Sequence, residues 1–162
     1  MADPMPLAGQ GGHTAFSFFC NGDPYAMLRR AQGEVLGLCN ILEEIADSLP
    51  DRLNRRRCRL AASIVEPLLA SVHEFEETTI FPMARRELWR LGASNNCINR
   101  LEAEHFEDQG YAGELAGALN NALESGAHNP EMLGYMLRGF FESVRRHTAF
   151  ERDYVSLLIA PR

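Results

Sequence analysis

One stretch decides the fold: residues 73–82, which read His-Glu-Phe-Glu-Glu-Thr-Thr-Ile-Phe-Pro. His73 and Glu77 are four residues apart, so on a helix they lie on the same face. The neighbours expected on that face are all apolar, namely Leu69, Ala70, Ile80 and Phe81. A histidine and a carboxylate are therefore predicted to point toward the core.

The same spacing returns near the C-terminus, where His147 and Glu151 are again four residues apart. Their helix face is also apolar, with Phe140, Val144, Phe150, Tyr154 and Leu158. A buried carboxylate is costly unless its charge is compensated. Two such pairs in one small domain indicate that a metal ion supplies the compensating charge.

Size and charge limit the classes of function. A chain of 162 residues with 46% hydrophobic residues is long enough for one domain with its own core. A net charge of −6 argues against nucleic acid or an anionic membrane as partner. The arginine clusters at residues 55–57 and 145–146 are interpreted as solvated helix faces.

No apolar run approaches the length of a membrane span, and the first basic residue is Arg29, so no signal peptide is recognised. A cytoplasmic protein is expected. The four cysteines, Cys20, Cys39, Cys58 and Cys97, are widely scattered and do not have the spacing of a zinc site. In a reducing compartment they are expected to be free thiols.

Four long segments have the hydrophobic period of a helix, and they span about residues 24–48, 52–81, 96–125 and 130–159. Asp23-Pro24 and Asn129-Pro130 each place an N-cap residue before a proline of the first turn. Residues 83–91 read as a short helical tail, and no segment has the period of a strand. We predict an all-α, antiparallel, up-down-up-down four-helix bundle over residues 23–162.

Residues 1–22, rich in glycine and proline, are predicted to form an irregular N-terminal arm. Its phenylalanines, Phe16, Phe18 and Phe19, are expected to dock on the bundle. His13, which also lies in this arm, is interpreted as a solvated residue.

The predicted bundle brings distant polar residues to one level, because residues equally far from a shared loop face each other in antiparallel helices. The side chains that converge in this way are Gln32, His73, Glu77, His105, His147 and Glu151. The two halves of the chain echo each other, since Leu28-x-x-x-Gln32 precedes one His-x-x-x-Glu and Leu101-x-x-x-His105 precedes the other. Three histidines and two glutamates at one level form a site for two metal ions, such as iron, zinc, copper or manganese.

Two better-known metal motifs do not match. Ferritin-like di-iron proteins use Glu-x-x-His, whereas this chain has His-x-x-x-Glu twice. The zinc-protease motif His-Glu-x-x-His would need a second histidine where Glu77 stands.

The chain resembles the hemerythrin-like, HHE cation-binding family over most of its length, from about Pro24 to Leu158. The resemblance is carried by His73-x-x-x-Glu77-x-x-Ile-Phe-Pro, by Glu104-His105 and by His147-x-x-x-Glu151. It implies a hemerythrin-like bundle with a non-haem di-iron centre, in which Glu77 and Glu151 bridge the two irons. His73 would serve one iron, and His105 and His147 the other.

Gln32 departs from the family pattern, which places a histidine at this point of the first helix. An amide oxygen is a poorer iron ligand than imidazole, so Gln32 is a weak candidate, and one iron or a different divalent metal is an alternative. Nearby polar residues that could substitute are Glu102, Asp108, Gln109 and His13. Cys39 is too far along its helix, and Tyr154 is expected to pack or to donate a hydrogen bond to a bridging carboxylate.

The sequence supplies no substrate pocket and no cofactor motif. The first hypothesis is therefore a protein that binds or senses oxygen, nitric oxide or oxidants, or takes part in iron handling, with metal ions and a small diatomic ligand as its partners. An oxidase or peroxidase using the same centre is the alternative. A metal-poor interaction module with the same fold is the third.

Overall fold

The computed structural model describes residues 22–125 and 129–161, and over these ranges it contains helices and no strand. The four long helices are α1 (Pro24–Asp47), α2 (Arg55–Phe75), α4 (Asn96–Ser125) and α5 (Pro130–Phe150). A π-helical turn, η2 (Glu76–Ile80), joins α2 to the shorter α3 (Phe81–Arg90). A second π-turn, η3 (Glu151–Val155), joins α5 to α6 (Ser156–Ile159). The all-α fold class is confirmed.

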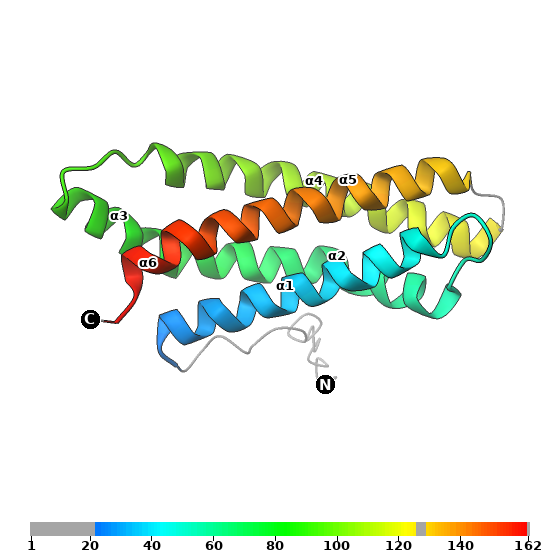
Figure 1. The fold of residues 1–162 in the computed structure, drawn as a ribbon, viewed down its shortest axis with the longest axis horizontal. Helices are drawn as coiled ribbons and strands as arrows, with labels where there is room; N and C mark the ends of the chain where they lie inside the picture. The colour runs from blue at the N-terminus through cyan, green and yellow to red at the C-terminus, as the bar shows by residue number, and fades with distance from the viewer. Residues whose placement is uncertain (1–21, 126–128, 162) are drawn as a thin grey trace, which may run out of the picture.

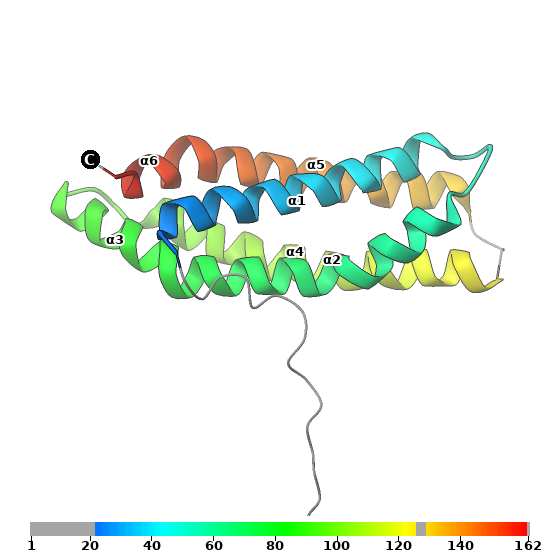
Figure 2. The same ribbon diagram turned by 90° about the horizontal axis from the view of Figure 1, so that it is seen from below.

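The long helices run antiparallel in the predicted up-down-up-down order (Figure 1). The closest pairings are α2 with α4 and α1 with α5, and α1 with α2 and α4 with α5 complete the square. The turned view in Figure 2 shows the same pairs of helices side by side. Consequently α1 lies diagonally opposite α4, and α2 diagonally opposite α5.

The helix ends follow the capping residues. The Asp23 carboxylate accepts a hydrogen bond from the Ala26 amide at 3.1 Å, and Asn129 accepts from Glu131 and Met132 in the same way. The second helix begins at Arg55 rather than at residue 52, because Asn54 is its cap and accepts from the Arg57 amide. Gly92, with φ of 67°, follows α3 in the left-handed conformation that glycine tolerates.

Each π-turn begins at a glutamate. The Phe81 amide donates to the Glu76 carbonyl, and the Ser156 amide donates to the Glu151 carbonyl. Such a turn holds one residue more than an α-turn and is often found at functional sites. The two turns are 75 residues apart, so Glu76 and Glu151 occupy equivalent places in the two halves of the bundle.

The buried apolar residues form two clusters at the two ends of the bundle. The larger contains residues such as Leu42, Leu69, Leu119 and Phe140, and the smaller contains residues such as Leu28, Phe81, Leu101 and Ile159. Between them every long helix contributes buried polar side chains, here called the polar slab: Gln32, His73, Glu76, His105, Asp108, His147, Thr148 and Glu151.

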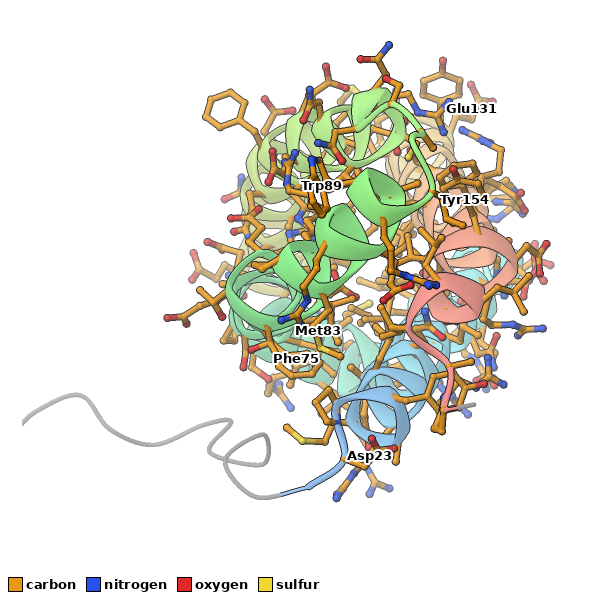
Figure 3. All side chains as sticks on the ribbon, turned by 90° about the vertical axis from the view of Figure 1, so that its left-hand side faces the viewer. Asp23, Phe75, Met83, Trp89, Glu131 and Tyr154 are labelled. Carbon is orange, nitrogen blue, oxygen red and sulfur yellow. The ribbon has the colours of Figure 1, made fainter. Side chains whose placement is uncertain are left out.

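Figure 3 views the bundle from the end that carries α3, α6 and the start of α1, where the exposed Trp89 lies.

No helix in the described ranges combines the length and the apolar character needed to cross a membrane. The docking of Phe16, Phe18 and Phe19 and the environment of His13 lie outside the described residues and stay predictions.

The packing of the core predicts how two phenylalanine variants differ in stability. Phe140 is 1% exposed in the larger apolar cluster, whereas Phe106 is 82% exposed on α4. Phe140→Ala is expected to lower the free energy of unfolding by about 3–5 kcal/mol, because it leaves a cavity. Phe106→Ala, the matched control, should change it by less than about 0.5 kcal/mol in chemical denaturation. Equal losses for the two variants would contradict this packing.

Candidate metal centre

Three histidines from three helices meet in the polar slab. His73 of α2 stacks on His105 of α4 with the ring centroids 3.8 Å apart and the planes within 5° of parallel. His147 of α5 lies 5.0 Å from His105 and 6.3 Å from His73, measured between ring centroids. The Phe81 ring lies 5.3 Å from His105 and joins this group to the smaller apolar cluster. The convergence expected for the three histidines is therefore present.

Of the two neighbouring glutamates of the opening motif, the structure buries Glu76 and not Glu77. The Glu76 side chain is 2% exposed, and the Glu77 side chain is 44% exposed. The inward position that the sequence analysis gave to Glu77 is thus held by Glu76, which that analysis did not select. Glu151 lies inside as expected, with a side chain that is 3% exposed.

The hydrophobic stripe of α2 explains this difference. Glu76 comes seven residues after Leu69 and four after Val72, both of which are buried, and it precedes the buried Ile80 by four. A residue with this spacing lies at the centre of the stripe, and Glu77 lies one residue further round, at its edge. The stripe was therefore a signal for Glu76, but the repeated His-x-x-x-Glu spacing favoured Glu77.

Each imidazole is held from outside by a polar side chain. The Nδ1 atom of His105 lies 2.8 Å from Glu77 Oε1, and Nδ1 of His147 lies 2.9 Å from Glu104 Oε2. Nδ1 of His73 lies 3.3 Å from the Gln109 amide nitrogen. A carboxylate on one ring nitrogen fixes the tautomer and orientation of a histidine that binds metal through the other nitrogen. Glu77 and Glu104 are placed to act in this way.

The opposite edges of the rings face the carboxylates inside the slab. Nε2 of His105 lies 3.3 Å from Glu76 Oε2 and 3.9 Å from Glu151 Oε1, and Nε2 of His147 lies 3.3 Å from the same Glu151 oxygen. Neither contact of His105 Nε2 has the geometry of a hydrogen bond, so within residues 22–125 and 129–161 this buried nitrogen has no hydrogen-bond partner. An inward ring nitrogen without a partner, beside carboxylates, is the donor set that a cation would use.

The described residues contain two groups whose ligand atoms all lie within 4.8 Å of one another. One group is His73, Glu76 and His105, and the other is His105, His147 and Glu151. His105 belongs to both, and its Nδ1 atom already contacts Glu77, so its Nε2 atom can serve only one metal position at a time.

Gln32 enters the slab from α1 and is 2% exposed. Neither its amide nitrogen nor its amide oxygen has a hydrogen-bond partner among the described residues. It lines a small cavity of about 10 Å³ together with His73, Glu76, Asp108, His147 and Glu151. The weak candidate of the sequence analysis therefore reaches the slab.

The electrostatics of the slab favour a cation. Burial raises the pKa of Glu76 well above its usual range, and the charge of Glu151 and a hydrogen bond with it raise it further. Burial, together with His105 and His147, lowers the pKa of His73 to about 2. Burial also lowers the pKa of His147, but its contacts with Glu151 and Glu104 outweigh this effect and raise it overall. The Glu76 carboxyl, which resists ionisation, and the His73 imidazole, which resists protonation, form surroundings that a metal cation would stabilise.

Comparison with known proteins agrees with this geometry. Residues 23–157 match the model of the family described as the hemerythrin HHE cation-binding domain. The chain belongs to this family. No curated protein and no solved structure matches it. The hemerythrin HHE match spans all four long helices and therefore includes every residue of the polar slab.

The other residues that were considered as ligands or neighbours of the metal site lie in different environments. Asp108 is 8% exposed and lines the cavity beside Gln32, and burial raises its pKa to about 6. Gln109 contacts His73, whereas Glu102 pairs with Arg85 at 2.7 Å on the surface. Tyr154 is 37% exposed, stacks on Phe150 and hydrogen-bonds to Cys97, and no hydrogen bond joins it to Glu151. Cys39 lies in the larger apolar cluster.

A groove of about 560 Å³ brings solvent to the histidines from one side. Its walls come from α2, η2 and α4, and they include His73 and His105 as well as the acidic Glu74, Glu77 and Glu102. The histidine cluster is therefore buried but lies close beneath the surface.

The placement of Glu76 can be tested in the metal-free protein. Its folded pKa lies above the ordinary 4.5, so the native state holds a proton that the unfolded state loses as pH rises. Stability from this group is present below about pH 4.5 and is lost at higher pH. Glu76→Gln should therefore be more stable than wild type at pH 8, and the difference should shrink toward pH 4.5.

The matched control is Glu74→Gln, which changes an exposed carboxyl two residues away. It should follow the wild-type dependence of melting temperature on pH, measured with chelator present. A flattened pH dependence in Glu74→Gln, or an unchanged one in Glu76→Gln, would refute the inward placement of Glu76.

Proposed function

We propose that this protein holds a non-haem iron centre in the polar slab and uses it to bind or sense a small oxidant such as oxygen or nitric oxide. His73, Glu76, His105, His147 and Glu151 are the proposed ligands. The single observation that carries the proposal is the arrangement of the rings, since His105 and His147 are held at Nδ1 by a carboxylate and turn Nε2 toward buried carboxylates. Imidazole and carboxylate together suit iron, although zinc and manganese also accept them.

The two metal positions are unequal in this proposal. The position served by His105, His147 and Glu151 has two imidazoles and a carboxylate, and it is the tighter one. The other position is served by His73 and Glu76, and it loses His105 when a metal fills the tighter position. It also has Gln32 where the family pattern has another imidazole. Glu77, which the sequence analysis assigned as a bridging ligand, is proposed to orient His105 instead.

A binding or sensing role is favoured over turnover by the shape of the site. The cavity at Gln32 has room for about one water-sized group, which suits a diatomic molecule better than a larger organic substrate. The groove over His73 and His105 is open to solvent and allows a small molecule to approach.

The decisive experiment is metal analysis of protein purified from iron-replete cells, followed by optical spectra of the reduced protein exposed to air. About one iron per chain and a reversible spectral change with oxygen or nitric oxide are expected. Steady turnover of peroxide would favour an enzyme. Protein without metal, and without affinity for added Fe(II), would refute the proposal.

Bound metal should stabilise the fold, because a ligand that binds only the native state raises its stability by mass action. Chelation is expected to lower the melting temperature of wild type by about 5–10 °C. The double variant Glu76→Gln with Glu151→Gln should be insensitive to chelator, whereas Glu74→Gln should respond as wild type does. Identical melting curves for wild type with and without chelator would contradict a metal held by the slab.

Gln32→His tests the inequality of the two positions, because it restores an imidazole where the family pattern has one. The iron content should rise from about one toward about two per chain, with a new oxo-bridged charge-transfer band in air. His147→Ala should abolish the tighter position. A wild-type protein that already binds two irons with similar affinity would show that Gln32 is not the weak point.

A further inference from the structure

Gln32 has hydrogen-bonding groups that no described residue contacts with a hydrogen bond. Its carboxamide is 2% exposed, and both polar atoms lack a hydrogen-bond partner among the described residues. An amide has two N–H donors and a carbonyl acceptor, and burying them without partners is costly. A buried amide retained in this way indicates a partner other than the described residues.

The space beside the amide limits what that partner can be. The small cavity of about 10 Å³ that Gln32 lines with His73 and His147 accommodates about one water-sized group. Its walls also contain the carboxyl groups of Glu76, Asp108 and Glu151. A neutral occupant is favoured over an anion, because like charges repel in a buried site.

Glutamine also differs from histidine in what it can donate. Its neutral amide oxygen is a weaker metal ligand than the imidazole nitrogen of a histidine. Its amide nitrogen, however, can donate a hydrogen bond to a small molecule beside it. An imidazole that binds a metal through one nitrogen cannot donate from that nitrogen.

We propose that Gln32 forms, with this cavity, the binding site for one small, neutral hydrogen-bond acceptor of about the size of water. Its Nε2–H group donates the hydrogen bond that orients this ligand. Gln32 is thus a positioning residue and not a metal ligand. The inference rests on the proposed function, since the ligand lies against the histidines that would hold iron.

Nitric oxide is a suitable probe, because it is small, neutral and a hydrogen-bond acceptor. The test uses the full chain loaded with Fe(II), and it compares wild type with Gln32→Leu, which has a similar size but no donor. Gln32→Leu is expected to weaken nitric oxide binding about fivefold. It should also shift the N–O stretching frequency, which reports a hydrogen bond directly, while the iron content stays unchanged.

The matched control is Val35→Ile, which alters the same cavity wall but leaves the carboxamide in place. It should change the affinity without the frequency shift seen in Gln32→Leu. An unchanged frequency and affinity in Gln32→Leu would overturn the inference and leave metal binding intact. Loss of iron from Gln32→Leu would overturn it by showing that Gln32 is a ligand. A wild-type chain that takes up no Fe(II) would instead refute the proposed function, and the inference would fail with it.

Discussion

Two carboxyl groups, Glu76 and Glu151, are buried next to three imidazoles in the middle of an apolar bundle. Removing carboxylates from water is unfavourable unless charge and hydrogen bonds compensate, and the raised pKa of Glu76 expresses this cost. Much of the local structure compensates for burying these two carboxyl groups. Glu77 and Glu104 hold His105 and His147 from outside, and the inner ring edges face the carboxylates. A cation at the centre would satisfy both sides at once.

The π-turns give this arrangement its place in the fold. Both begin at the inward glutamate, and in both the residue five positions later donates to the carbonyl of that glutamate. Counted from these turns, Leu69, Val72, Glu76 and Ile80 correspond to Val144, His147, Glu151 and Val155. His73 therefore corresponds to Thr148 and not to His147, so the two halves do not present their histidines in the same way. The histidine and the inward glutamate are three residues apart in one half and four in the other.

Stability and function are separated along the bundle axis. The two apolar clusters on either side of the polar slab hold the four helices together, and the slab itself consists of groups that are poorly compensated without a cation. Local conflicts between residue type and environment are expected where a protein acts on something outside itself. Among the described residues Gln32 is such a conflict, because neither polar atom of its buried amide has a hydrogen-bond partner there.

The four long helices and the level of the site could be predicted from the amino-acid sequence. Hydrophobic period and capping residues placed all four long helices, and α4 begins and ends at the residues predicted for it. Helical rise and short connections fix which residues of antiparallel helices share one level, and they predict a common slab for Gln32, His73, His105, His147 and Glu151. The family match confirms the resemblance that was drawn from these motifs.

Two sequence signals, the hydrophobic stripe and the repeated His-x-x-x-Glu spacing, favoured different glutamates, and the packing of the helices settles that Glu76 points inward and shows what holds each ring. Glu76 and Glu77 come three and four residues after His73, and both positions lie close to the His73 face of a helix. Which of the two side chains is buried therefore depends on how α2 packs against α4. The contacts of Glu104 and Gln109 with the histidines join different helices, and no local pattern in the sequence encodes them. Local periodicity therefore determined the elements and their order, and packing between helices determined the donor set.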